Sequence, residues 1–251
     1  MSIEEFIDQL GLPEASKVDS KVFKRLFYEH GELKSVDKKL FSDDVDEIII
    51  RYTLTPETIP IRDYQDDDRV YDEIAVMQVK LRRDKPAKRI AEIIQRSIPY
   101  PLIILFNHDQ SIMLNLADKR LNKADSSKLV IESMLHSPWL DLSAAPEFAK
   151  NFLQGFSIRQ CRFGNLYQFY QDWMQAVLNL NASQYVKKDI KDKPADYETQ
   201  HKALQAIDTA NEKINELRSK LKSANQLNEK MQLNVQIKAQ QQKIEQLKQQ
   251  L

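Results

Sequence analysis

The sequence EIAVMQVKLRR at residues 73–83 is followed by KPAKRIAEIIQRSI at 85–98 and by PYPLIILF at 99–106. In the first segment Met77, Val79 and Leu81 alternate with the residues of the opposite face, which is the period of a β-strand. The isoleucines of the second segment recur at helical spacing, and Pro86 stands where the first turn of a helix tolerates proline. The third segment is a continuous apolar run, typical of a strand covered on both faces. The three segments predict a β-α-β unit with parallel, neighbouring strands.

The flanking sequence extends this unit in both directions. The run IIIRYTLT at 48–55 predicts a strand, and Thr58–Ile61 predicts a short return strand. After residue 106 the pattern predicts a hairpin strand at 111–121 and a further strand over Lys128–Leu135. We therefore expect an α/β or α+β fold. Its core at residues 46–136 is a mixed sheet of about five or six strands with flanking helices.

The remaining segments, apart from one linker, are predicted to be helical. Residues 1–45 form an N-terminal helical segment, in which a helix over 20–30 faces Phe23 and Leu26 inward. Residues 137–185 continue the core, because the aromatic side chains between Phe163 and Trp173 recur at helical spacing and favour packing over base stacking. Residues 186–196 are a charged linker, and residues 197–251 are a long coiled-coil helix without glycine or proline.

Apolar residues of the last segment form two seams that are displaced from each other, with Asn228 in a core position between them. Displaced seams of this kind favour packing of the helix on a partner. Alternatively, the helix folds back at residues 223–229 and buries the apolar residues within one chain. We expect weak self-association through this segment in the isolated protein. The candidate partner-binding residues are Ile207, Ile214, Leu217, Leu221, Asn228, Leu233, Ile237, Ile244 and Leu247.

Composition excludes several classes of protein. The 251 residues include 37 basic and 37 acidic side chains, so no net charge draws the chain to nucleic acid or to an anionic membrane. Four glycines are too few for a nucleotide-binding loop, and the single cysteine, Cys161, excludes an internal disulfide. The four histidines lack ligand spacing, so we expect no metal and no cofactor. The acidic start without a signal peptide or membrane span predicts a cytoplasmic protein.

One pattern is compatible with catalysis. Nucleases of the PD-(D/E)xK class place an acid on one strand and a Glu or Gln two residues before a Lys on the next strand. Gln78 and Lys80 have this spacing, with Asp63 or, less well, Asp72 or Asp46 as the acid. This alternative predicts a Mg²⁺-dependent DNA nuclease, although a Gln-x-Lys spacing on an amphipathic strand also arises by chance.

Two charged stretches allow further interpretations. The loop of residues 62–72 contains three consecutive aspartates and is expected to be solvated rather than to hold a metal. The second alternative function is a DNA-binding module, which requires one continuous basic face. Its candidate residues, beside Lys80, are Arg82, Arg83, Lys85, Lys88 and Arg89.

Several segments together resemble an uncharacterised bacterial family of the domain-of-unknown-function type. They are TLTPETIPI (53–61), EIAVMQVKL (73–81), KRIAEIIQRSIPYPLIILF (88–106), LADKRLNKADSSKLVIE (116–132) and ANQLNEKMQLNVQIKAQQQKIEQL (224–247). The resemblance implies a C-terminal coiled coil and genes encoded beside helicases and DNA methyltransferases in phage-defence or restriction-modification loci. We therefore expect an accessory or assembly subunit of such a complex, which recruits a helicase or a DNA methyltransferase through its C-terminal helix.

Overall fold

The computed structural model describes residues 1–30, 33–123, 125–186 and 196–251. These residues form two compact units, Met1–Val177 and Leu178–Leu251. The predicted linker at 186–196 lies almost entirely outside the described residues. No described helix combines the length and apolar character that crossing a membrane requires.

The predicted β-α-β unit is confirmed. Strand β5 (Ile74–Leu81), helix α4 (Ala87–Ser97) and strand β6 (Leu102–His108) follow one another, and β5 pairs in parallel with β6. Helix α4 buries its isoleucines, and it ends at Ser97 because Ile98 precedes a proline and takes an extended conformation. The periodicity of the sequence is therefore sufficient to define this part of the fold.

Around this unit, seven of the described strands form one mixed sheet in the order β1-β2-β5-β6-β7-β8, with β9 paired to β7. The β5–β6 pair is parallel and the other pairs are antiparallel. The other strands of the sheet are β1 (Lys17–Lys21), β2 (Val45–Leu54), β7 (Ser111–Asn122), β8 (Asp125–His136) and β9 (Leu140–Asp141). The predicted fold class is thus confirmed. The sheet also contains two strands outside the predicted core, β1 before it and β9 after it, which the sequence did not reveal.

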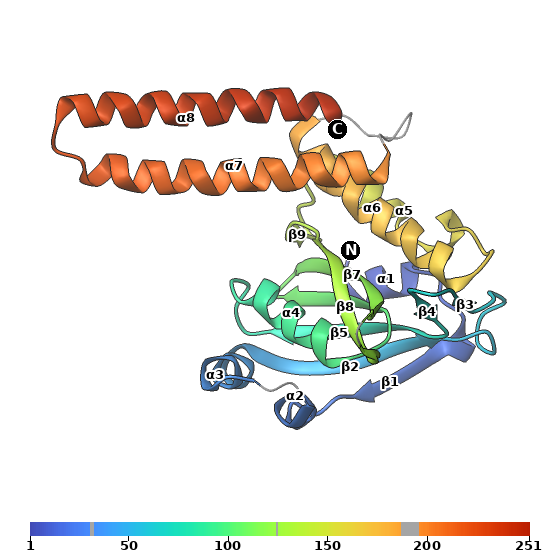
Figure 1. Cartoon of the computed structure of the whole chain (residues 1–251). Coiled ribbons are helices and arrows are strands. Elements are labelled where there is room, and N and C mark those ends of the chain that lie inside the picture. Colours follow the sequence, from blue (N-terminus) through green and yellow to red (C-terminus); the bar gives the residue numbers. More distant parts are fainter. Residues whose placement is uncertain (31–32, 124, 187–195) are drawn as a thin grey trace. The chain divides into compact units, whose positions relative to one another are not determined.

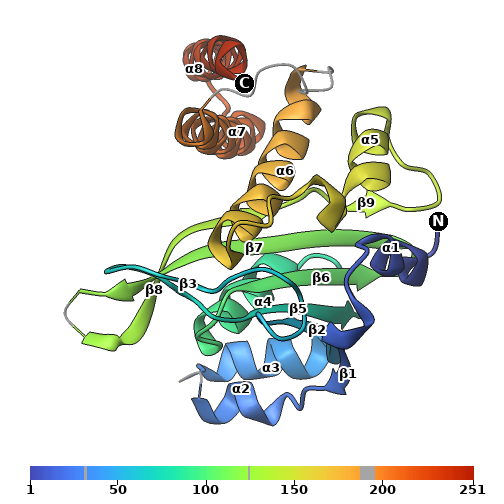
Figure 2. The ribbon, with the colours of Figure 1, turned by 90° about the vertical axis from the view of Figure 1, so that its right-hand side faces the viewer.

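Helices cover both faces of the sheet (Figure 2). On one face, α2 (Arg25–His30), α3 (Ser35–Asp44) and α4 enclose a core cluster that includes Met77, Val79 and Phe106. The other face is covered by α1 (Ile3–Gln9), α5 (Glu147–Gly155) and the part of α6 (Leu166–Val186) that precedes Leu178. There the ring centroids of Phe156 and Trp173 lie 5.2 Å apart, so the aromatic residues at helical spacing pack in the core, as predicted.

Three expectations about residues 1–61 are wrong. Residues 17–21, predicted as part of a helical segment, form the edge strand β1, whose side chains are all exposed. Helix α2 begins only at Arg25, so Phe23 and Leu26 are exposed instead of facing the core. The predicted return strand at Thr58–Ile61 is a turn, in which the amide of Thr58 donates to the carbonyl of Thr55 at 2.9 Å. Short apolar runs do not by themselves distinguish these conformations.

The second unit contains a hairpin of two long helices, α7 (Tyr197–Ser223) and α8 (Leu227–Leu247), which lie side by side and antiparallel (Figure 1). At about 1.5 Å per residue, α7 is roughly 40 Å long. The connection is three residues, 224–226, of which Ala224 and Gln226 are extended. The long C-terminal helix is therefore present, and it is followed by a second helix that folds back along it.

Candidate functional site

Gln78 and Lys80 lie on the face of β5 opposite the core cluster of Met77 and Val79, as the alternation predicts. Gln78 is buried, and its amide donates to the side-chain oxygen of Asn107 on β6 at 3.0 Å. Its own side-chain oxygen accepts a hydrogen bond from Arg51 at 3.3 Å. Both ends of the Gln78 amide are thus occupied by protein groups, and this glutamine fastens neighbouring strands together.

Lys80 lies beside Asp46, one of the two acids that the sequence favours less than Asp63. The ammonium of Lys80 and the guanidinium of Arg82 are 3.3 and 3.2 Å from the two carboxylate oxygens of Asp46. The hydrogen bond from Lys80 is the main reason why the pKa of Asp46 is lowered. A single carboxylate that already faces two cations is a poor ligand for Mg²⁺.

Asp63 is exposed and belongs to a different region. The carbonyl of the residue before it accepts a hydrogen bond from Leu166, at the start of α6. One turn further along α6, the hydroxyl of Tyr170 donates to the carbonyl of Leu102, at the start of β6. Because β5 and β6 are parallel, this contact lies beside the start of β5, whereas Lys80 is near its end. The structure therefore does not bring Asp63 to Lys80. No group of three or more metal-ligating side chains is placed for an ion among the described residues.

The predicted basic residues do not form a free cationic face, because most of them are paired with carboxylates. Arg83 forms an ion pair with Asp44, and Arg89 contacts Asp37 through two hydrogen bonds of 2.9 and 2.7 Å. Lys85 and Lys88 have no carboxylate within ion-pair distance among the described residues. Paired cations lose most of their attraction for phosphate, so this segment is a weak platform for duplex DNA.

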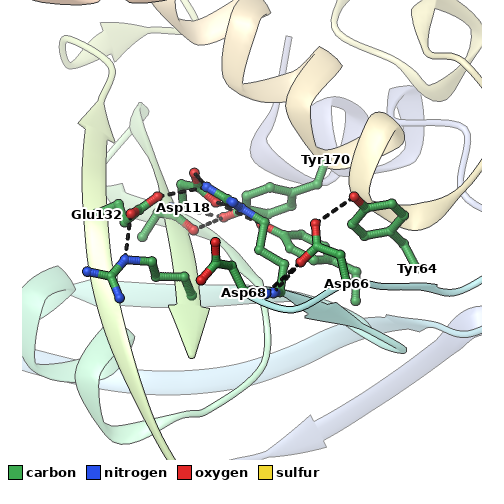
Figure 3. A network of polar contacts seen from close by, with 10 residues as sticks. Tyr64, Asp66, Asp68, Asp118, Glu132 and Tyr170 are labelled. Atoms are coloured by element: carbon green, nitrogen blue, oxygen red, sulfur yellow. Dashed lines mark hydrogen bonds and ion pairs between the residues drawn. The ribbon is translucent and has the colours of Figure 1, made fainter. Parts of the chain in front are cut away.

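The acidic loop is folded rather than simply solvated, and it forms the hairpin of β3 (Tyr64–Gln65) and β4 (Val70–Tyr71). Its turn is closed by Asp66, which accepts hydrogen bonds from the amides of Asp68 and Arg69 at 2.9 and 2.6 Å. The hydroxyl of Tyr64 donates to the other oxygen of Asp66 at 2.7 Å (Figure 3). An aspartate that caps its own turn in this way is held by local hydrogen bonds, without a metal.

Arg69 connects this hairpin to the sheet (Figure 3). Its guanidinium lies 3.0 Å from Asp118 on β7 and 2.7 Å from Glu132 on β8. The buried hydroxyl of Tyr71 donates to Asp118 at 3.2 Å, and burial raises the pKa of this phenol far above its usual value. The guanidinium of Arg69 is shared by these two carboxylates, and Glu132 also forms an ion pair with Arg120, so we interpret the network as a clamp that fixes the loop.

Lys119 on β7 is almost fully buried, with an exposed fraction of 3%. Its ammonium donates to the carbonyls of Ile98 and Tyr100, at 2.8 Å each. These carbonyls belong to the loop that leads into β6. Burial lowers the pKa of Lys119 to about 7.

Cys161 is no candidate nucleophile, because burial raises the pKa of its thiol to about 12.

The seam predicted for the C-terminal segment is closed within the chain itself. Side chains of α7, of α8 and of the connection between them form one buried cluster, which consists of Ile207, Ala210, Ile214, Leu217, Ala224, Leu233, Ile237 and Ile244. Leu221 and Leu247, also predicted to bind a partner, are partly buried against it. The described hairpin therefore satisfies its own apolar seam, which removes the reason for expecting self-association through these residues.

Asn228 is exposed in the first turn of α8, so its predicted core position is wrong. The heptad count fails here because α7 ends at Ser223 and α8 begins a new register at Leu227. The displacement between the two predicted seams has the same origin: each seam belongs to a different helix, and the two meet face to face.

A second apolar stripe on α8 remains exposed. Leu227, Met231 and Val235 follow one another at intervals of four residues, and 73%, 60% and 68% of their respective surfaces are accessible. Residues 218–238 at this end of the hairpin contain five basic side chains and one acidic side chain, a net charge of +4. The hairpin tip, by which we mean residues 218–238, thus combines an apolar stripe with positive charge.

Residues 10–244 match the family description "Domain of unknown function (DUF4391)". The chain belongs to the DUF4391 family. The resemblance to a family of unknown function is thereby confirmed, and the DUF4391 match includes the sheet and most of the hairpin. No curated protein and no solved structure matches the chain.

Sequence reasoning missed the exposed stripe of this DUF4391 chain, although a signal for it exists. Leu227, Met231 and Val235 are separated by four residues and belong to neither predicted seam. The apolar positions of α8 therefore exceed what one buried seam can hold, and such an excess predicts a second contact face.

Proposed function

We propose that the protein is a non-catalytic accessory subunit of a bacterial defence or restriction-modification-like complex, and that it binds a partner subunit through the hairpin tip. The observation that carries the proposal is the exposed stripe of Leu227, Met231 and Val235. Full burial of an aliphatic side chain of this size is worth about 1.5–3 kcal/mol, so the stripe has the composition of a binding epitope.

Charge indicates what kind of surface covers the stripe. The tip carries a net charge of +4, so two tips repel each other, whereas an apolar surface bordered by carboxylates attracts one. The proposed partner therefore presents an acidic, amphipathic helix or groove. The predicted seam residues, from Ile207 to Leu247, support this role indirectly, because they hold the two helices of the hairpin together.

The identity of the partner rests on the family resemblance, which implies helicase and DNA methyltransferase subunits encoded nearby. A helical hairpin is well suited to such assembly, since it presents a preorganised surface and little chain entropy is lost on binding. The nuclease and DNA-binding alternatives lack comparable support, because the acids and cations on which they depend are separated or paired.

The test is co-expression of the tagged full-length chain with the helicase and the methyltransferase encoded beside it, followed by affinity capture and light scattering. We expect capture by the parent protein and its loss when Leu227, Met231 and Val235 are all replaced by Gln. The matched control is Gln232→Ala with Gln236→Ala, which changes exposed polar positions of the same helix.

Two outcomes would overturn the proposal. Equal capture by the parent and the triple Gln variant would show that the stripe is not the docking surface. A concentration-dependent dimer of the parent alone, converted to a monomer in the triple variant, would show that the stripe binds a second copy. In all variants the circular dichroism spectrum must retain the helical signal of the parent, because the substituted side chains are exposed.

A further inference from the structure

A groove of about 410 Å³ lies between α4 and the edge strand β8. One wall comes from α4 and carries three cations, Lys88, Arg89 and Arg96, and one carboxylate, Glu92. The floor is formed by two apolar side chains and an imidazole. These floor residues are Ile131, Met134 and His136 of β8. The groove belongs entirely to the unit Met1–Val177 and is separate from the hairpin tip.

An irregularity in β8 creates this floor. Strict alternation would place Ile131 on one face of the strand and Met134 and His136 on the other. The register between β7 and β8 shifts here, because Ser133 pairs with Asp118 while Ile131 pairs with Lys119. The extra residue brings Ile131 to the same side as Met134 and His136, which is the usual effect of a β-bulge.

The cations of the wall exceed the carboxylates available to them. Glu92 accepts from both Arg89 and Arg96, at 2.7 and 3.0 Å, so one carboxylate serves two guanidiniums. Asp37 completes the neutralisation of Arg89. Lys88, one turn before Glu92, has no carboxylate of the described residues within ion-pair distance. The three cations of the wall thus face two carboxylates, and the net charge of +1 resides on Lys88.

The floor adds an aromatic ring without adding charge. The amide of Asn115 contacts Nδ1 of His136 at 3.3 Å and also donates to the carbonyl of Leu135 at 2.9 Å. Burial and the neighbouring charge of Lys88 lower the pKa of His136 to about 4. The imidazole is consequently neutral at physiological pH and offers a flat, uncharged face beside Met134.

We propose that this groove binds a nucleotide, with its phosphate on Lys88, beside Arg96, and its base against Ile131, Met134 and His136. A cationic wall beside an apolar floor matches an anionic group joined to a planar ring, and the volume lies within the range of small-molecule sites. The source is a free nucleotide or one unit of a single strand. Duplex DNA fits less well, because the neighbouring cations Arg82, Arg83 and Arg89 are engaged by carboxylates.

The experiment titrates the full-length protein with two probes: ATP, followed by calorimetry, and a fluorescein-labelled oligothymidine, followed by polarisation. The charge variant is Lys88→Glu with Arg96→Glu, and the matched control is Lys38→Glu with Lys39→Glu on exposed positions of α3. A third variant, Met134→Trp, fills the groove without changing any charge.

We expect the charge variant and Met134→Trp each to weaken binding at least about tenfold, and the control to leave it unchanged. Contact with one phosphate of a single strand predicts a salt slope near −0.7, or about a 2.6-fold loss between about 50 and 200 mM salt. Binding of ATP identifies a free nucleotide as the ligand, and binding of the oligonucleotide alone identifies a strand. The proposal is overturned if neither probe binds, or if both groove variants, folded by circular dichroism, bind like the parent.

Discussion

The pH dependence of stability offers a sharp test of the buried Lys119. Burial lowers its pKa from the usual 10.5 to about 7 in the folded protein. Between these values the unfolded chain binds a proton that the folded chain lacks, so the free energy of unfolding must increase as the pH rises. From about pH 7.5 to about pH 9.5 the increase from this one group is about 2.5 kcal/mol, since a full proton difference is worth about 1.36 kcal/mol per pH unit.

The perturbation is Lys119→Met, which keeps most of the volume and removes the titratable group. Urea unfolding at several pH values, followed by tryptophan fluorescence, is the assay. Trp139 and Trp173, the two tryptophans of the chain, lie in the unit Met1–Val177, so the signal reports on the sheet and not on the hairpin. We expect the parent to gain about 2.5 kcal/mol relative to the variant across this pH range.

The absolute stability of Lys119→Met is a less direct observable. Replacing Lys119 by Met removes the cost of desolvating the ammonium, but it leaves the carbonyls of Ile98 and Tyr100 without their hydrogen-bond donor. The difference in slope is free of this ambiguity, because all other groups titrate alike in both proteins. Lys39→Met, at an exposed position, is the control and should follow the parent. Parallel pH profiles of the parent and Lys119→Met would refute the reasoning, since Lys119 would then keep its ordinary pKa.

Three further predictions concern other parts of the chain. Arg69→Met should lower the free energy of unfolding by about 2–3 kcal/mol, a value between those of exposed and buried ion pairs. Adding Asp118→Asn should restore part of this loss, because it removes the carboxylate that Arg69→Met leaves unpaired. Equal stability of the parent and Arg69→Met in urea would contradict the clamp. Leu217→Glu places a charge in the hairpin seam, so the helical signal should fall while tryptophan emission is retained, and a change in emission would show that the sheet depends on the hairpin. Because burial lowers the pKa of His136 to about 4, the protein should lose up to about 3 kcal/mol of its free energy of unfolding as the pH falls from about 6.5 to about 4. In acid titrations His136→Gln should abolish this loss.

The sequence by itself determined the centre of the fold. The alternation in β5, the isoleucine spacing in α4 and the apolar run of β6 predict a parallel pair with a crossover helix, as observed. This succeeds because each pattern is local: a period of two or of 3.6 residues states which side chains face the core. The same reasoning fails near Phe23 and Thr58, where segments are too short for a period to be distinguished.

The tertiary structure alone decided which groups meet. Arg69 contacts Asp118, which is 49 positions away in the chain. The charge of Lys88 on α4 lowers the pKa of His136 on β8. Neither pairing can be read from spacing, because each depends on strand order and on one bulged residue in β8.

The C-terminal segment shows the same division. Its sequence states that an apolar seam must be covered, but not whether the chain itself or another molecule covers it. A turn of three residues resolves the choice, since the tethered α8 is present at a high effective concentration beside α7. Closing the seam from within uses Leu233, Ile237 and Ile244, and leaves the stripe of Leu227, Met231 and Val235 exposed. The sequence thus specifies how much apolar surface exists, and three-dimensional packing determines which part of it remains for a partner.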